Sequence, residues 1–197
     1  MSLPLRVVLR DLNPELTGAW EKSFSGVAGV EVCADDFFSD PADAVVSPAN
    51  SFGVMDGGLD LAIRSTLPGI EPAVQARIVA KYHGEIPVGC AEVVETSHSD
   101  WPYLVCAPTM RVPENISRTL NAYLAMRAIL IAVLRFNAEH GPLIKTLVIP
   151  GLGTGVGRMP PTRCASQMRL AYDLIAMPPG IPGFHAIQST HIRLLSE

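Results

Sequence analysis

The stretch from residue 43 to residue 63 constrains the fold of this chain more than any other. Its sequence is DAVVSPANSFGVMDGGLDLAI. A short apolar run ends at Pro48, a turn-rich segment follows, and apolar residues then recur at helical spacing. The stretch therefore predicts a buried strand, a polar loop and the start of a helix. Gly57 and Gly58 leave backbone N–H groups unobstructed, and a helix N-terminus adds further unpaired donors, so this loop suits an anion such as a phosphate.

A second stretch repeats this design. Residues 144–149 predict a strand that ends at Pro150, and glycine then occurs at every other position from Gly151 to Gly157. Pro161 is well placed in the first turn of a following helix. Because two such loops would lie at the carboxyl ends of strands, they predict one crevice with two walls for a diphosphate. The second loop matches neither a P-loop nor G-x-G-x-x-G.

Composition limits the classes of ligand. The net charge is −4, which argues against a broad electrostatic grip on nucleic acid, so an anionic ligand would have to be held by local backbone donors. The cysteines are widely spaced and form no C-x-x-C pair, which argues against a zinc site and favours reduced thiols. We expect no metal and no cofactor.

The chain carries no sequence signal for a membrane. Charged residues interrupt the N-terminal apolar run, which therefore does not resemble a signal peptide. The apolar run 122–136 contains Arg127 and Arg135 and predicts a buried helix rather than a membrane span. We therefore expect a soluble cytoplasmic protein; the oligomeric state is left open.

Strands alternate with helices along most of the sequence. Strands are expected at about 5–9, 27–34, 44–47, 91–95, 104–107 and 144–149, and helices at about 16–24, 59–66, 72–83, 115–139 and 161–176. Residues 184–195 alternate in part and are expected to form one last strand. This order predicts a single α/β domain over residues 1–197. We expect a three-layer α/β/α sandwich with a mixed, largely parallel central sheet of six or seven strands.

Taken together, the two loops resemble those of the macrodomain, an ADP-ribose-binding module. The family pattern Asp-Ala-Ile-Val-Asn-Ala-Ala-Asn corresponds to residues 43–50, and Val-Asp-Gly-Ala-Ile, which opens a helix, corresponds to residues 56–63. A Gly-Asp-Ile-like turn corresponds to Asp36-Phe37, and the Ser-Thr-Gly-x-aromatic-Gly loop to residues 153–158. The resemblance covers about residues 28–176.

The resemblance implies a role for each matching residue. Asp36 would accept a hydrogen bond from the adenine amino group, and Asn50 would bind the distal ribose. Asp60 matches the acidic residue with which hydrolytic macrodomains position or activate water. The ligand-binding set that the resemblance implies is Asp36, Phe37, Ala49, Asn50, Asp56, Gly57, Gly58, Gly153, Thr154, Gly155, Val156, Gly157 and Arg158, with Asn50 and Asp60 as the catalytic residues.

Three departures from the family pattern bear on activity. Gly157 replaces the aromatic that packs against the distal ribose, and Ser47 replaces the first Asn of the pattern. Asp56 adds a carboxylate where many members have glycine. Phe52 and Arg158 are candidates to replace the aromatic contact. The segment 107–113 resembles a distinct bacterial or phage-associated branch.

Simpler interpretations stand beside these roles. In the simpler interpretation, Asp60 serves only to stabilise a helix N-terminus, and Asn50 only forms hydrogen bonds within its own turn. Asp35 competes with Asp36 for the adenine position. Three functions remain open. The first is a hydrolase of ADP-ribosyl esters, O-acetyl-ADP-ribose or ADP-ribose 1''-phosphate. The second is a non-catalytic ADP-ribose or nucleotide reader, and the third is a phage-type structural protein without a ligand.

Overall fold

The computed structural model describes residues 3–196 and contains one mixed sheet flanked by helices. Its elements, in chain order, are β1 (Arg6–Arg10), α1 (Pro14–Ser23), β2 (Val30–Cys33), β3 (Ala44–Ser47), α2 (Gly58–Thr66), α3 (Ile70–Tyr82), β4 (Glu92–Glu95), β5 (Tyr103–Cys106), α4 (Asn121–His140), β6 (Thr146–Ile149), α5 (Pro161–Ala176) and α6 (Phe184–Ser196). The six strands of the described part lie in the order β2-β1-β6-β3-β5-β4. All neighbours are parallel except β4, which runs antiparallel to β5.

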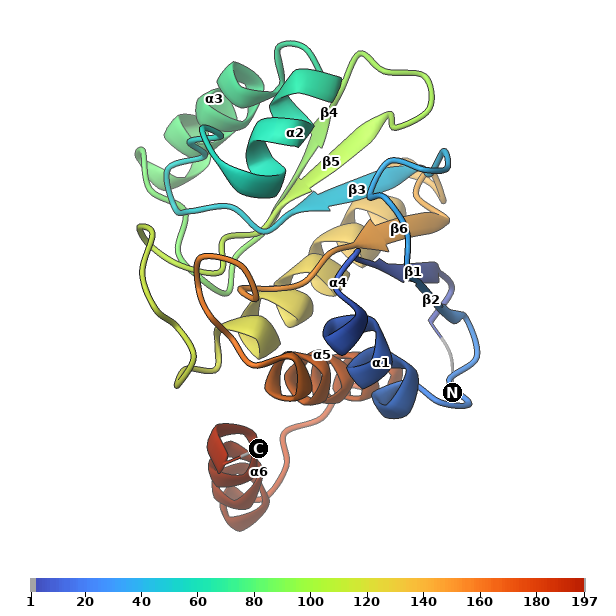
Figure 1. Cartoon of the computed structure of the whole chain (residues 1–197), viewed down its shortest axis with the longest axis vertical. Helices are drawn as coiled ribbons and strands as arrows, with labels where there is room; N and C mark the ends of the chain where they lie inside the picture. Colours follow the sequence, from blue (N-terminus) through green and yellow to red (C-terminus); the bar gives the residue numbers. More distant parts are fainter. Residues whose placement is uncertain (1–2, 197) are drawn as a thin grey trace.

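The helices cover both faces of this sheet, as Figure 1 shows. One core cluster joins the sheet to α1, α4 and α5, and a second joins it to α2 and α3. Alternate residues of β1 serve the two clusters, because Val7 and Leu9 belong to the first and Val8 to the second. The α/β/α sandwich with a mixed, largely parallel sheet that the sequence predicts is therefore confirmed.

The central strands explain why the chain closes into three layers. All four residues of β3 are buried, as expected for a strand of a parallel sheet that is covered on both faces. The neighbouring β6 is likewise buried over its last three residues. Both strands end at the same edge of the sheet, and each is followed there by one of the two glycine loops.

Two sequence-based expectations were wrong. Residues 184–195 form helix α6 and not a last strand. Their apolar positions 184, 187, 194 and 195 repeat at helical spacing, and the partial alternation was misleading over so short a segment.

The long helix α4 begins at Asn121, six residues later than expected. Residues 115–120 instead form turns, in which the side chain of Asn115 accepts from the N–H of Ser117 and that of Thr119 from the N–H of Asn121.

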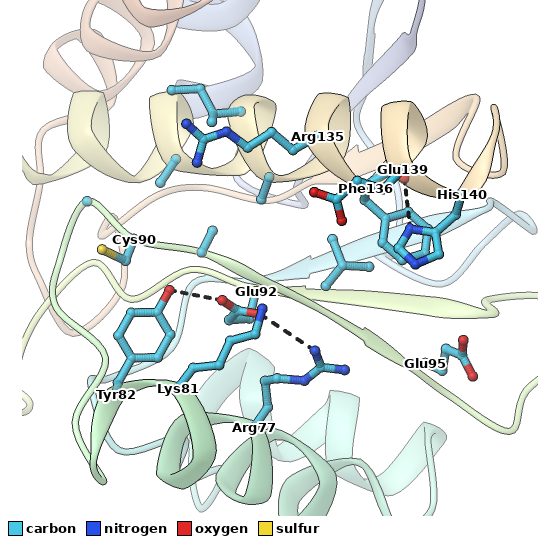
Figure 2. A pocket seen from close by; sticks show the side chains of 16 residues that line it. Arg77, Lys81, Tyr82, Cys90, Glu92, Glu95, Arg135, Phe136, Glu139 and His140 are labelled. Carbon is cyan, nitrogen blue, oxygen red and sulfur yellow. Dashed lines mark hydrogen bonds and ion pairs between the residues drawn. The ribbon is translucent and has the colours of Figure 1, made fainter.

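Strand β4 lies at one edge of the sheet and has β5 as its neighbour. Figure 2 shows this edge, with α4 on one side of the strand and α3 on the other. Side chains of both helices line a cavity of about 500 Å³ along it. None of the helices within residues 3–196 is long and apolar enough to cross a membrane.

Candidate functional site

The two glycine loops line one cavity at the carboxyl ends of β1, β3 and β6. Its volume is about 400 Å³. Eleven of the residues singled out in the sequence lie around it: Ala49, Asn50, Asp56, Gly57, Gly58, Asp60, Gly153, Thr154, Gly155, Val156 and Gly157. Parallel strand ends gather at one edge of a sheet, and this brings together loops that are about 100 residues apart in the sequence.

The first wall of the cavity is the N-terminus of α2. Gly57 precedes the helix in an extended conformation, and the first N–H to bond back to it belongs to Leu61. The N–H groups of residues 58–60 therefore remain unpaired by the helix. A Cβ atom added at Gly57 or at Gly58 would meet no atom within 4 Å, so both glycines face open space. This wall offers backbone donors and a positive helix end to an anion.

The second wall uses its glycines in two ways. Gly155 is open, since an added Cβ would meet nothing within 4 Å. At Gly157 the added Cβ would lie 2.5 Å from the Gly153 carbonyl oxygen and 2.7 Å from Cγ1 of Ile116. No aromatic side chain can leave this position without moving the loop backbone. The departure from the family pattern at Gly157 therefore belongs to a loop that closes tightly on itself and on Ile116.

The N–H groups of this second wall also lack partners. Gly153 and Gly155 use their carbonyl oxygens to accept bonds from Met159 and Arg158. Within the described part of the chain, however, no protein acceptor is recorded for the N–H groups of residues 153–157. Gly155 and Val156 are exposed, so their donors are accessible from the cavity. Two sets of unpaired backbone donors thus border the same space.

Asp60 supplies a carboxylate with an altered acidity. Its Oδ1 accepts a hydrogen bond from Oγ of Ser47 at 2.7 Å, while no protein partner of Oδ2 is recorded among residues 3–196. Burial raises the pKa of Asp60 to about 6, the Ser47 hydrogen bond opposes this shift, and the negative charge of Asp56 adds to it. Ser47, which replaces the Asn of the family pattern, thus contacts the predicted catalytic group directly.

Asn50 bonds to its own loop. Its Nδ2 donates to the carbonyl oxygen of Val54 at 2.8 Å, and its Oδ1 accepts from the N–H groups of Phe52 and Val54 at 3.0 and 3.3 Å. This is the turn-stabilising role that the sequence left open. Asn50 still lines the cavity, and its ribose contact and its catalytic part remain predictions.

Three predicted ligand-binding residues do not line this cavity. Phe37 is buried in the core against Phe38, and Arg158 is exposed at the loop end, with a left-handed φ of 54°. Asp36 is exposed, and its Oδ1 accepts from the N–H of Phe38. Phe52, a candidate for the missing aromatic contact, instead lies under the guanidinium of Arg111. The adenine-side roles of Asp36 and Phe37 stay predictions.

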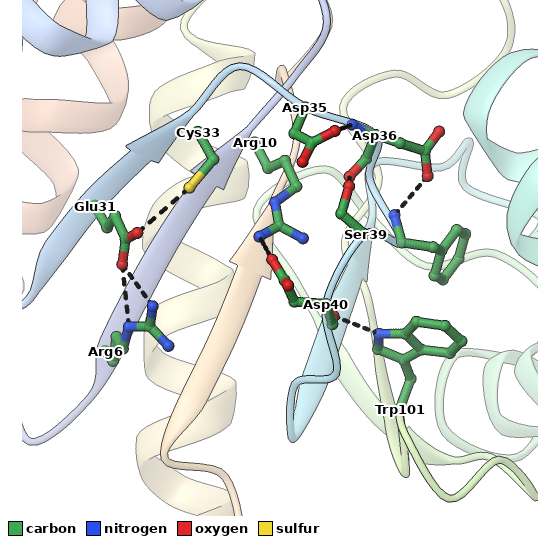
Figure 3. A network of polar contacts seen from close by, with 10 residues as sticks. Arg6, Arg10, Glu31, Cys33, Asp35, Asp36, Ser39, Asp40 and Trp101 are labelled. Carbon is green, nitrogen blue, oxygen red and sulfur yellow. Dashed lines mark hydrogen bonds and ion pairs between the residues drawn. The ribbon is translucent and has the colours of Figure 1, made fainter.

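The loop that carries Asp36 is held in place by hydrogen bonds from Arg10 and Trp101 to Asp40 (Figure 3). Arg10, only 5% exposed, donates to Oδ2 of Asp40 at 2.5 Å. Nε1 of Trp101 donates to the Asp40 carbonyl oxygen at 3.1 Å. The loop therefore has a defined position between β2 and β3, next to the carboxyl edge of the sheet.

The sequence interpretation missed other cavity residues. Asp11 accepts from the N–H of Asn13 at 2.9 Å and from that of Gly151 at 3.3 Å, so it ties β1 to the second loop. The available signal was a carboxylate directly after an apolar strand. Thr109 and Met110 come from the segment 107–113, which pairs with the first loop through a bridge between Asn50 and Met110. Within residues 3–196, no three His, Cys, Asp or Glu side chains form a group that could hold a metal ion.

The family model for the Macro domain matches residues 46–168. This chain belongs to the macrodomain family. The match begins within β3 and ends within α5, so it contains both walls of the cavity. An uncharacterized protein of Aquifex aeolicus (strain VF5) is 35% identical over 127 residues, which are 64% of this chain and 70% of that protein.

Solved macrodomains share the fold at lower identity. The macrodomain of Mycobacterium tuberculosis DarG is 22% identical, with a TM-score of 0.58 over 73% of this chain and 89% of that one. Thermosipho africanus DarTG, solved in complex with ADP-ribose, is 18% identical, with a TM-score of 0.55 over 95% of this chain and 57% of that one. At these identities the likeness shows the fold alone.

Proposed function

We propose that this macrodomain binds ADP-ribose or a derivative of it in the cavity between the two glycine loops. The observation that carries the proposal is the pair of facing backbone walls. Unpaired N–H groups at the start of α2 and in residues 153–157 border one space of about 400 Å³. Backbone donors of this kind suit a diphosphate, which the net negative charge of the chain would otherwise disfavour. The ADP-ribose bound to the similar DarTG fold supports the same ligand class.

We further propose that the protein hydrolyses an ADP-ribosyl ester or ADP-ribose 1''-phosphate, with Asp60 as the general base. Ser47 holds Oδ1 of the carboxylate, and Oδ2 is left to accept a proton from water. A pKa of about 6 keeps Asp60 largely ionised at neutral pH and close to the pH at which a base works best. The activated water would attack the ester or phosphate group at the distal ribose or the anomeric carbon itself.

A non-catalytic reader of ADP-ribose is the second candidate. Asn50 favours it, because its amide is already bonded to Phe52 and Val54 and would have to give up these bonds to orient a ribose. Asp56 also favours it, since a second carboxylate near Asp60 repels an anionic transition state. Affinity for ADP-ribose without turnover of any derivative would identify this function.

Calorimetric titration with ADP-ribose, with AMP and NAD as controls, tests the binding site. We expect a micromolar Kd, or ~−8 kcal/mol. Gly155→Val should weaken binding about tenfold or more, because its side chain would enter the cavity. Gly180→Val is the matched control, since Gly180 also faces open space but lies between α5 and α6. No binding by the unaltered protein would contradict the proposal and favour a structural role.

A further inference from the structure

The outer edge of strand β4 carries backbone hydrogen-bonding groups that no other strand of the sheet within residues 3–196 pairs with. In the β4–β5 ladder Glu92 faces Cys106 and Val94 faces Leu104, and the N–H of Thr96 bonds to the Pro102 carbonyl oxygen. Hydrogen-bonded pairs alternate in an antiparallel ladder, so the backbone groups of Glu92 and Val94 point toward β5. Those of Val93 and Glu95 point outward. Within the described chain, no protein partner is recorded for these outward groups.

Side chains of α3 and α4 flank this edge closely, and Glu92, Val93 and Val94 are each at most 9% exposed. The cavity of about 500 Å³ follows it between α3 and α4, as Figure 2 shows. Small residues keep the space open, because Gly89 and Ala91 lead into the strand and Ala128 and Ala132 line the facing side of α4. A natural edge strand is usually blocked by a helix, a bulge or a proline. Here a channel is left between the side chains of α3 and α4.

The two walls differ in chemistry. On the α3 side, Glu92 accepts from Nζ of Lys81 at 2.8 Å and from the Tyr82 hydroxyl at 2.9 Å, with Arg77 4.0 Å away. Two cations therefore share one carboxylate, and one positive charge is left over. Lys81 and Arg77 are about half exposed, at 51% and 42%, and both line the channel, so the excess positive charge belongs to its α3 wall.

The α4 side is mostly apolar. Residues 128, 131, 132 and 136 form a stripe at helical spacing that contributes Ala, Ile, Ala and Phe to the channel. Charges on this wall come from Arg135 and Glu139, which offset one another, and Glu95 lies at the far end of the strand. Val93 packs into the core on this side, whereas Val94 packs on the α3 side.

We propose that this channel binds an extended segment of a partner protein, added as a strand to β4, in which apolar and acidic side chains alternate. Directly opposed residues of neighbouring strands point to the same face. A residue opposite Val93 would exchange backbone hydrogen bonds with it and place an apolar side chain on the α4 stripe. The residues on either side of it would place carboxylates near Lys81 and Arg77. Main-chain bonds would provide the affinity and the alternating side chains the specificity.

A synthetic peptide tests the proposal. The probe is fluorescein-labelled Gly-Glu-Val-Glu-Val-Glu-Gly, measured by fluorescence anisotropy with the full chain. We expect saturable binding, and about tenfold or greater loss when both valines carry N-methyl groups, because N-methylation removes the donors that face Val93. A peptide with lysine in place of glutamate should bind about tenfold more weakly.

A pair of variants locates the binding. Ala132→Trp fills the channel and should abolish peptide binding. Ala138→Trp is the matched control, since Ala138 is exposed on α4 but does not line the channel. ADP-ribose affinity should be the same in both variants. The proposal is overturned if the peptide does not bind or if N-methylation has no effect. It is also overturned if sedimentation shows a dimer that Ala132→Trp dissociates and Ala138→Trp does not, because two copies of the chain would then occupy each other's β4 edges.

Discussion

The two walls of the proposed ADP-ribose cavity both contain glycine, but for opposite reasons. In the first loop, Gly57 and Gly58 face open space, and the absence of a side chain keeps the backbone accessible. In the second loop, Gly153 and Gly157 are packed against Ile116, and an added Cβ would lie 2.4 and 2.7 Å from its side chain. Gly155 alone among the glycines of residues 153–157 behaves like those of the first loop.

This difference indicates that the first wall serves ligand binding, whereas the packed glycines of the second loop serve the stability of the fold. The first wall also carries the carboxylates of Asp56 and of Asp60, which lies in the first turn of α2, whereas residues 153–157 carry no charged side chain. We therefore expect changes at residues 56–60 to alter chemistry and affinity with little effect on folding. Changes at the packed glycines of the second loop should mainly lower stability. Each of the following measurements tests one part of this division.

The largest effect is expected at Asp60. Asp60→Asn keeps the shape and can still accept the Ser47 hydrogen bond, but it cannot accept a proton from water. Turnover of ADP-ribose 1''-phosphate or O-acetyl-ADP-ribose should fall by about 10²–10⁴-fold, with the Kd for ADP-ribose nearly unchanged. Asp56→Asn is the control, since it removes a neighbouring charge from the same loop. Equal losses in both variants would mean that Asp60 acts only through its charge.

A smaller effect, on stability, is expected at Gly157. Gly157→Ala should lower the free energy of unfolding by about 1–3 kcal/mol, because the Cβ would be forced against the Gly153 carbonyl oxygen. Gly155→Ala, two residues away, should leave it unchanged or raise it by up to about 1 kcal/mol. Urea denaturation of both variants measures the difference. Similar stabilities would show that the second loop is not held by close packing.

The smallest effect concerns Ser47. Its hydrogen bond lowers the pKa of Asp60, so Ser47→Ala should raise that pKa further above its ordinary value. The acid limb of the pH–rate profile should then move to higher pH, while the KM changes little. Ser65→Ala is the control, because Ser65 bonds within α2 to the carbonyl of Leu61. An unshifted acid limb would show that Ser47 does not tune the base.

Much of this architecture could be predicted from the sequence, because its strongest signals are local. Continuous apolar runs such as residues 44–47 and 146–149 predict buried parallel strands, and the glycine loops after them predict where a cavity forms. The helix 161–176 is predicted with its observed bounds, since Pro161 at its start and the prolines after Met177 limit it on both sides. The prediction of a strand at residues 184–195 was wrong, because the polarity pattern of so short a segment fits both the strand period of two and the helical period of 3.6 residues.

The details of the site were harder to predict, because they depend on contacts between distant residues. Asp11 reaches the cavity only because β1 pairs with β6, and its local signal, a carboxylate directly after an apolar strand, is weak. The tight packing of Gly157 depends on Ile116, about 40 residues earlier in the chain. The hydrogen bond between Ser47 and Asp60 spans 13 residues and appears only when β3 and α2 are placed side by side.

The raised pKa of Asp60 has a consequence for the energetics of ligand binding. Because the folded pKa of about 6 lies above the ordinary value of 3.8, Asp60 favours the fold when protonated, and this contribution is lost as the pH rises through 6. A bound diphosphate would bring more negative charge to the same cavity and would raise the pKa of Asp60 above its value in the free protein. Binding of ADP-ribose near pH 6.5 should therefore take up protons from solution. Calorimetry in two buffers of different ionisation enthalpy would detect this uptake as a difference in apparent binding enthalpy, which Asp60→Asn should remove.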